Sequence, residues 1–407
     1  MRAMVALLGI LLFLAIAYFA CDNRKAINWR TVGVALALQI GIGAFVFGVP
    51  QGRSILELVS DRVSDTIGAG KAGVDFLFGP LSQDGSTSLG FIFAFRVLPM
   101  IIFFSSLIAV LYHLGIMQKV ILILGGGLRA VLKTSRAESM SAAANIFVGQ
   151  TEAPLIVKPY ISRMTQSELF AVMVGGLASI AGSVLASYAA IGVDMKFLIS
   201  ASFMAAPGGL LYAKLMKPEV DKPRESRLDF AEGDEKPANV VDAAALGAAS
   251  GLKLALNVGA MLLAFVGLIA LINLLLGGIG NWIHHPSLSL QEIFGFVFSP
   301  VAWATGIPWS EASQGGTLIG QKLALNEFVA YFEFIQYKSA LTPKSQAICS
   351  VALCGFANLS SIAILLGGLG SMAPNRRADI ARLGMKAVLA GTLSNLTSAA
   401  IVGFFIS

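Results

Sequence analysis

Long apolar runs alternate with short basic loops along the chain. A helix needs about 20 mostly apolar residues to cross the hydrocarbon core of a membrane. Eight runs are close to this length, and each therefore predicts one transmembrane helix. The eight runs are Met4 to Cys21, Thr31 to Gly52, Phe91 to Gln118, Leu169 to Val193, Phe197 to Ala213, Leu254 to Leu276, Ser345 to Gly370 and Ala387 to Ser407.

The segment that follows the second run has a different pattern. From Ser54 to Gly70, apolar residues alternate with Glu57, Asp61, Arg62 and Asp65 at roughly helical spacing. This pattern predicts an amphipathic helix that lies at the outer membrane interface.

The low content of charged residues indicates that lipid rather than water surrounds most of the protein. Of the 407 residues, 56% are hydrophobic and 13% are charged, whereas about a quarter of the residues of a soluble domain are charged. The chain lacks the charged residues that a water-exposed surface of this size requires. The three cysteines, Cys21, Cys349 and Cys354, cannot all pair and are interpreted as packing residues. The sequence thus predicts an all-α integral membrane protein.

The net charge of +6 reflects topology rather than nucleic-acid binding, because the basic residues lie in loops between apolar runs. Loops rich in Lys and Arg face the cytoplasm. Such loops follow the first, third, fifth and seventh runs, so both termini are expected outside the cytoplasm, in the inner (plasma) membrane. The anchoring residues include Arg24, Lys25, Arg30, Lys119, Arg129, Lys133, Arg136, Lys214, Lys217, Lys222, Arg224, Arg227, Arg376, Arg377, Arg382 and Lys386.

Two further segments must return to the side of the membrane from which they start. Ala137 to Tyr160 lies between basic loops on both sides, which excludes an odd number of crossings. Gln291 to Thr342 contains the apolar run Ile293 to Ser310, and an odd crossing there would place Arg376 outside. Each segment therefore predicts a re-entrant helical hairpin.

A repeat relates the two hairpins. Asn145 to Val148 (Asn-Ile-Phe-Val) in the first resembles Asn326 to Val329 (Asn-Glu-Phe-Val) in the second. A second pair, Gly176 to Ser179 and Gly355 to Asn358, follows 31 and 29 residues after the respective asparagines. Three runs separate the copies, so the second half is inverted relative to the first. Inverted repeats with broken helices are typical of transporters whose site lies near the bilayer midplane.

These elements divide the chain into five parts. A scaffold with the first three spans and the interfacial helix at 54–70 is expected at 1–136, and the first repeat of a transport domain at 137–216. A cytoplasmic linker is expected at 217–245. Another scaffold span and a following helix are expected at 246–308, and the second repeat at 309–407.

Polar residues gather in the two hairpins, where protein or a water-filled cavity must cover them. They are Asn145, Gln150, Thr151, Glu152, Asn326 and Glu327. Carboxylates with amides and hydroxyls suit a neutral polar ligand with several hydrogen-bonding groups, and half-helix ends suit a small cation. In a structural reading, Glu152 and Glu327 would instead bind backbone amides freed by the hairpin breaks.

Two other protein classes fit the sequence less well. An intramembrane enzyme would need a catalytic motif, but the chain has no His-Glu-x-x-His zinc sequence and no Cys and His placed as nucleophile and base. A channel is disfavoured because paired hairpin tips that converge on one site suit occlusion.

Four motifs closely resemble signatures of the concentrative nucleoside transporter family, above all its bacterial sodium-coupled members. They are Phe147 to Pro154 (FVGQTEAP), Ser179 to Val184 (SIAGSV), Asn326 to Tyr331 (NEFVAY) and Cys354 to Ser361 (CGFANLSS). The resemblance runs essentially end to end. It implies eight transmembrane helices, two oppositely oriented re-entrant hairpins, a homotrimer and a transport domain that moves against a scaffold.

The resemblance also implies site residues. Those implied to face the nucleobase are Gln150, Thr151, Glu152 and Val184. Those implied to hold or line the ribose are Glu327, Phe356, Asn358 and Ser361. Those implied to bind sodium, through oxygen alone, are the side chains of Asn145 and Ser179 and the carbonyls of Val148 and Ile180. Oxygen ligands suit a hard cation.

The function that follows is sodium-coupled import of nucleosides such as uridine, by alternating access, with Na⁺ as the coupling ion. Proton coupling through Glu152 or Glu327 is the alternative, since some family members use it. Gly149, before the Gln-Thr-Glu run, leaves both pyrimidine and purine nucleosides open as substrates.

Overall fold

The fold is known from a computed structural model that describes residues 2–82, 91–221, 223, 237–282, 284–285 and 287–406, and it consists there of helices without β-strands. Residues 222 and 224–236 of the linker expected at 217–245, which include most of its charged residues, lie outside the described residues. The α-helices are α1 (Arg2–Phe19), α2 (Trp29–Gly43), α3 (Pro50–Phe78), α4 (Phe93–Arg96), α5 (Leu98–His113), α6 (Ile116–Leu132), α7 (Arg136–Ala144), α8 (Lys158–Ile161), α9 (Gln166–Ala178), α10 (Gly182–Ala190), α11 (Met195–Met216), α12 (Val240–Trp282), α13 (Leu290–Ala304), α14 (Ala312–Ala324), α15 (Glu327–Tyr337), α16 (Pro343–Ala352), α17 (Ser360–Met372) and α18 (Arg377–Phe405).

Apolar helices long enough to cross a membrane are present among the described residues. They are Trp29–Gly48, Phe93–His113, Gln166–Ala190, Met195–Met216, Val240–Trp282 and Pro374–Phe405, and Met4–Phe19, Leu290–Ala304 and Ser360–Met372 are shorter apolar helices. The protein is therefore a helical membrane protein. The count of eight crossings and the five-part division remain predictions.

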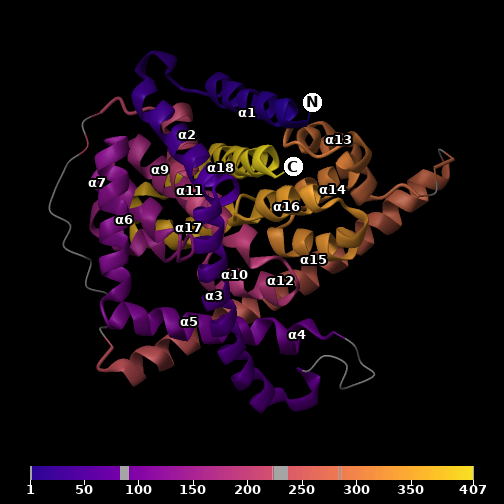
Figure 1. Ribbon diagram of the computed structural model, residues 1–407, viewed down its shortest axis with the longest axis horizontal. Coiled ribbons are helices and arrows are strands. Elements are labelled where there is room, and N and C mark those ends of the chain that lie inside the picture. Colours follow the sequence, from indigo (N-terminus) through magenta and orange to yellow (C-terminus); the bar gives the residue numbers. More distant parts are fainter. Residues whose placement is uncertain are drawn as a thin grey trace.

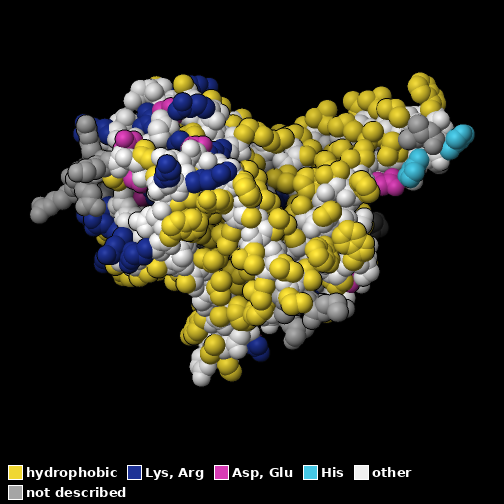
Figure 2. Space-filling view, turned by 90° about the horizontal axis from the view of Figure 1, so that it is seen from above, with side chains coloured by type: hydrophobic (Ala, Val, Ile, Leu, Met, Phe, Trp, Pro, Cys, Tyr) yellow, Lys and Arg dark blue, Asp and Glu magenta, His cyan; other side chains and the backbone are white. Residues whose placement is uncertain are grey.

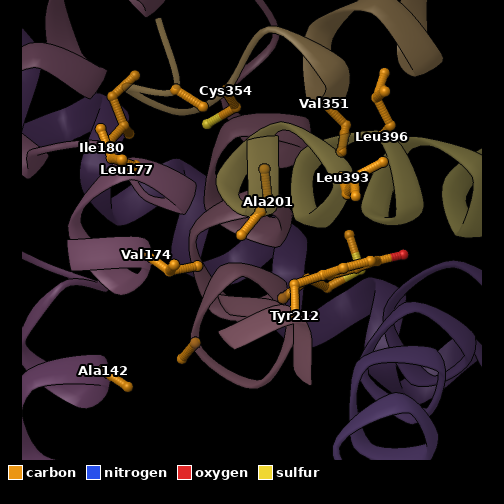
Figure 3. Packing of buried hydrophobic residues seen from close by; sticks show 14 of the residues in the cluster. Ala142, Val174, Leu177, Ile180, Ala201, Tyr212, Val351, Cys354, Leu393 and Leu396 are labelled. Carbon is orange, nitrogen blue, oxygen red and sulfur yellow. The ribbon is translucent and has the colours of Figure 1, made fainter. Parts of the chain in front are cut away.

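Helices α7 to α11 and α14 to α18 form the centre of the molecule, and α1, α3, α5 and α12 lie around it (Figure 1). The central helices α9 and α11 are almost completely buried, and α16 and α18 are buried over most of their length. Val174, Ala201, Val351 and Leu393 come from these four helices and meet in one apolar cluster (Figure 3). The core is thus made by residues from both halves of the repeat.

The peripheral helix α12 differs from these central helices in that most of its surface is exposed. It packs along α5, and its C-terminal part projects from the body of the molecule (Figure 1). Its apolar side chains are largely exposed: Leu263 is 80% and Leu274 72% accessible. Exposed leucines of this kind require lipid or another apolar surface around them.

Glycines allow the close contact between α12 and α5. A Cβ at Gly247 would lie 2.7 Å from the carbonyl oxygen of Ser105, and one at Gly251 would lie 2.8 Å from Cα of Ile102. The four-residue spacing puts both glycines on one face of α12, so the two backbones approach as in the small-xxx-small pattern of membrane helices.

Two expected crossings are interrupted. The run from Leu169 to Val193 is broken between α9 and α10 at 179–181, and the run from Ser345 to Gly370 is broken between α16 and α17 at 353–359. The two returning segments contain their own breaks, after α7 and between α14 and α15.

The amphipathic pattern predicted at Ser54 to Gly70 lies within the longer helix α3, and its charged side chains are exposed. The structure contains a further helix that the pattern analysis did not predict, α6, which carries Lys119 and Arg129. Most of the visible Lys and Arg side chains gather at one end of the molecule, and histidine side chains are visible at the opposite tip (Figure 2). This separation agrees with basic residues that anchor one side in the cytoplasm.

Candidate functional site

The four breaks in the helices meet in the centre of the protein. In the first half, the hairpin tip is held to the broken span by a hydrogen bond from Gly182 N to Phe147 O (2.9 Å). In the second half, Leu359 N donates to Leu323 O (3.1 Å). The two broken spans are joined by Phe356 N, which donates to Ser179 O (3.1 Å). The backbone N–H groups that the breaks leave without a partner in their own helix therefore donate to carbonyls of other elements, within each half of the repeat and between the halves.

One cavity of about 540 Å³ opens at this junction. It is lined by every residue that the sequence assigns to the substrate: Gln150, Thr151, Glu152, Val184, Glu327, Phe356, Asn358 and Ser361. These residues come from both hairpins and both broken spans, although more than 200 positions separate the first from the last. A site of this size, with an apolar wall and a few polar groups, is typical of small-molecule binding.

Glu327 is the most strongly bonded acid of the cavity. It begins α15 and is only 4% exposed. Its two carboxylate oxygens accept hydrogen bonds from Tyr188 Oη (3.1 Å) and Asn358 Nδ2 (2.9 Å). Asn358 is itself fixed, because its Oδ1 accepts a hydrogen bond from Ser361 N (2.9 Å) in the first turn of α17. The carboxylate is thus pre-oriented for donors on a ligand.

Glu152 and Gln150 belong to the first hairpin. Glu152 accepts a hydrogen bond from Gly149 N (3.1 Å), as expected if it binds a backbone amide freed by the hairpin break. Its side chain also lines the cavity, where it can contact a ligand. Gln150 donates from Nε2 to Ser361 Oγ (3.3 Å), a contact between the halves of the repeat. Gln150 Oε1 is buried without a hydrogen-bond partner among the described residues. It is available to a donor on a ligand.

The residues assigned to a cation do not line the central cavity but adjoin residues that do, since Val148 precedes Gly149 and Ile180 precedes Ala181. Asn145 directly follows α7, and Ser179 directly follows α9. Asn145 Nδ2 donates to Ser141 O (2.9 Å), which leaves its Oδ1 buried without a partner in the described part of the chain. The carbonyls of Val148 and Ile180 lie outside helices and accept no backbone hydrogen bond from the described residues.

This oxygen set fits a hard monovalent cation. Buried polar oxygens without partners are costly, so a ligand that binds them is favoured. No group of three or more His, Cys, Asp and Glu that could hold a metal occurs among the described residues. The donors assigned to the cation are oxygen atoms alone, the ligand type that hard cations prefer.

The opposite wall of the cavity was not anticipated. Ser105 of α5 and Lys253 and Asn257 of α12 line it. Lys253 stands at the start of the sixth apolar run, where the sequence alone favours a partnered or snorkelling charge over a substrate ligand, because nothing in the pattern places α12 against the hairpins. The close packing of α12 against α5 explains why Lys253 lines the cavity.

Models of one transporter family match most of the chain. "Na⁺ dependent nucleoside transporter N-terminus" matches residues 8–81, "Nucleoside recognition" residues 94–195 and "Na⁺ dependent nucleoside transporter C-terminus" residues 197–403.

Named relatives agree with these matches. The chain is 50% identical to "Nucleoside permease NupC" of Helicobacter pylori, over 99% of this chain and 98% of that protein. It is 39% identical to "Sodium/nucleoside cotransporter 1" of Mus musculus, over 98% of this chain and 63% of that longer protein.

Solved structures also match over the whole length. The chain is 57% identical to CNTnw "in an inward-facing substrate-bound state", with a TM-score of 0.96, 100% of this chain and 98% of that chain covered. A CNTnw variant in an outward-facing state matches with a TM-score of 0.97, and 100% of this chain and 99% of that chain are covered.

Apolar helices around a polar cavity between paired broken elements define a membrane transport protein, and not an enzyme. The chain belongs to the Na⁺ dependent nucleoside transporter family.

Proposed function

We propose that this protein is a sodium-coupled symporter that imports nucleosides such as uridine. The observation that carries the proposal is the single cavity in which polar side chains of both hairpins and both broken spans converge. Glu327, Asn358 and Ser361 would hold the ribose hydroxyls, and Gln150, Thr151 and Glu152 would face the base. Val184 and Phe356 would pack against the ligand.

Sodium would bind the side chains of Asn145 and Ser179 and the carbonyls of Val148 and Ile180. The ion would neutralise the C-terminal end of α9 and satisfy the unpartnered Asn145 Oδ1. Phe147 O accepts a hydrogen bond from Gly182 N, which joins the first broken span to the first hairpin. An ion that orders its ligands would therefore also order the first hairpin, which carries Gln150 to Glu152. This link would couple ion binding to nucleoside binding.

A second cavity supports an inward route. It measures about 500 Å³, lies between α5, α12 and the first hairpin, and shares Ser105, Glu152 and Ser250 with the central cavity. It extends to Tyr112, near the end of α5, and to Gln118, which precedes Lys119 in the first turn of α6. We infer release to the cytoplasm along this path, with elevator-like movement of the hairpins and broken spans against α5 and α12 between the two access states.

We further propose an assembly and an orientation. The protein would form the homotrimer that the family resemblance implies, with the exposed apolar length of α12 against a neighbouring subunit or membrane lipid. The basic end would face the cytoplasm, so that both termini lie outside it.

Uptake of labelled uridine into proteoliposomes tests the function. We expect accumulation only with an inward sodium gradient. Uptake that is unchanged when choline replaces sodium contradicts sodium coupling.

Proton coupling is the second candidate, because Glu152 and Glu327 both line the cavity. If protons drive transport, Asn145→Ala and Ser179→Ala should leave uptake intact, and an inward proton gradient should replace the sodium gradient.

A further inference from the structure

Lys322 lies in the membrane-embedded centre of the protein and has no place in the site described above. It belongs to α14 and is only 2% exposed. Its Nζ donates to Ala352 O (2.8 Å), in the last turn of α16, and to Asn395 Oδ1 (2.7 Å) of α18. Its ammonium also interacts electrostatically with the carboxylate of Glu327. A cation in this environment requires such partners, because desolvation is costly.

The inverted repeat relates this lysine to the proposed ion site. Lys322 precedes the tip residue Asn326 by four positions, and Ser141 precedes the tip residue Asn145 by four. In the first half, Ser141 Oγ and Asn145 Oδ1 are both buried without partners among the described residues. In the second half, Asn326 Oδ1 accepts from Val329 N (3.0 Å), and the lysine supplies a positive charge.

The Lys322 ammonium and the proposed sodium ion would also occupy comparable places on the two broken spans. On the first broken span the proposed sodium ligands begin at Ser179, which directly follows α9. The Lys322 ammonium binds the carbonyl of Ala352, which ends α16. In each half a cation therefore lies at the C-terminal end of the first half-helix, where the helix dipole favours positive charge.

Asn395 connects the two positions. Its Nδ2 donates to Ala178 O (2.6 Å), at the end of α9, and to Cys354 O (3.0 Å), in the second break. Its Oδ1 accepts from Lys322. One amide of α18 thus joins the lysine to the last carbonyl before the proposed sodium ligand Ser179.

We propose that Lys322 is a tethered cation: its ammonium holds, in the second half of the repeat, the place that the free cation takes in the first. The inference rests on the proposed function for the identity of the free cation alone. Lys322 keeps the second broken span closed in every state and balances the charge of Glu327. The first span has no such lysine, so its closure depends on the ion. Lys322 is a positioning residue for both sites.

Chemical rescue in purified protein tests this role without nucleoside transport. Truncation by Lys322→Ala should lower the unfolding temperature by roughly 5–15 °C, as expected for a broken buried ionic contact. Methylammonium fits the vacated space and should restore at least half of the loss, whereas tetramethylammonium is too large and should restore none. Lys322→Met is the matched control, because it fills the space without charge: it should be as unstable as Lys322→Ala, and methylammonium should not stabilise it.

Sodium titration of the same variants gives a readout that a purely structural lysine would not change. Loss of the ammonium should act on the sodium site through Asn395. The sodium concentration that gives half of the full thermal stabilisation should rise by about 10-fold or more, the equivalent of one lost hydrogen bond to a charged group. Methylammonium should reverse this shift in Lys322→Ala alone.

A Lys322→Met protein with wild-type unfolding temperature and sodium response overturns the proposal, as does a folded Lys322→Ala protein that methylammonium does not stabilise. If Lys322→Ala aggregates, purification in methylammonium decides: recovery of monodisperse protein supports the tethered cation, and failure there overturns it. Because neither readout uses a nucleoside, a protein that fails to transport uridine leaves the test intact.

Discussion

At the scale of single residues, Glu327 has the geometry of a hydroxyl acceptor. Both oxygens already accept hydrogen bonds, from Tyr188 and Asn358. We expect Glu327→Gln to weaken uridine binding by roughly 5–150-fold, because the new amide places a donor against existing donors and leaves buried groups unpaired. Titration calorimetry of uridine into purified protein measures this loss.

Glu333→Gln is the control for that substitution. Glu333 lies on the same helix, where it accepts from Tyr337 Oη (2.9 Å), and it does not line the cavity. It should bind uridine like the wild type. Equal binding by Glu327→Gln and the wild type would remove Glu327 from the ribose site.

Ser179 is predicted to act on the ion rather than on the nucleoside. Its Oγ donates to Gly175 O (2.9 Å), so its lone pairs remain for a cation. Ser179→Ala should raise the sodium concentration for half-maximal uridine uptake by about 10-fold, a loss of roughly one oxygen contact to a charge. Ser202→Ala is the matched control, because Ser202 Oγ makes the same kind of bond, to Leu198 O (3.0 Å), on α11. If both variants shift the sodium dependence equally, Ser179 has no special role.

Sequence patterns identify only part of the site at this scale. The carboxylates Glu152 and Glu327 stand out as charges in re-entrant segments. Asn145 and Ser179 do not, because isolated polar residues usually pack helices, and only the family resemblance selects them. Lys322 and Asn395 were missed, since their partners are backbone carbonyls more than 25 positions away.

At the scale of elements, the seam between α12 and α5 sets the wall of the cavity. We expect Gly251→Val to force the helices apart, because a Cβ there would meet Ile102 Cα at 2.8 Å. The cost of such overpacking is about 1–3 kcal/mol, which thermal unfolding in detergent would detect. Gly267→Val, on the same helix with open space around it, should leave the unfolding temperature unchanged. Similar losses in both variants would show that helix propensity, not the seam, is responsible.

Hydropathy and charge predicted most helices but not their interruptions. Ser179 to Gly182 and Cys354 to Asn358 are short and mostly apolar, so the breaks at 179–181 and 353–359 do not disturb the apolar runs. Their cause is tertiary: Phe356 N, Gly182 N and Leu359 N find acceptors in other elements. Helix α6 was missed because its basic residues were interpreted only as a loop.

At the scale of the whole molecule, Asp22 ties the first loop to the two halves of the core. Its carboxylate binds Lys217, after α11 (2.8 Å), and Lys386 of α18. Partial burial opposes ionisation, but these two lysines hold the pKa of Asp22 below its ordinary value of 3.8. A lowered pKa in the folded state contributes stability that is present above the unfolded value and lost as pH falls through the folded one.

Asp22→Asn should therefore destabilise the protein at neutral pH but not in strong acid. The expected difference at pH 7 is about 0.2–1 kcal/mol for each exposed pair, and it should disappear as the pH falls through the lowered pKa of Asp22. Thermal unfolding of both proteins across this pH range measures it. Asp61→Asn, on the exposed side of α3, serves as the control and should show no difference at any pH. A difference for Asp22→Asn that persists in acid contradicts the electrostatic origin.

The separation of charge across the molecule predicts its sidedness. Lys and Arg gather at one end, and the histidines after α12 lie at the other (Figure 2). Cys349 and Cys354 are buried and should not react with maleimides, so Cys21→Ser gives a background without accessible thiols. In right-side-out vesicles, an impermeant maleimide should label Ser287→Cys beyond α12, whereas Lys25→Cys should react only after permeabilisation, because basic loops stay in the cytoplasm. The reverse pattern would place both termini in the cytoplasm and make the proposed inward route an outward one.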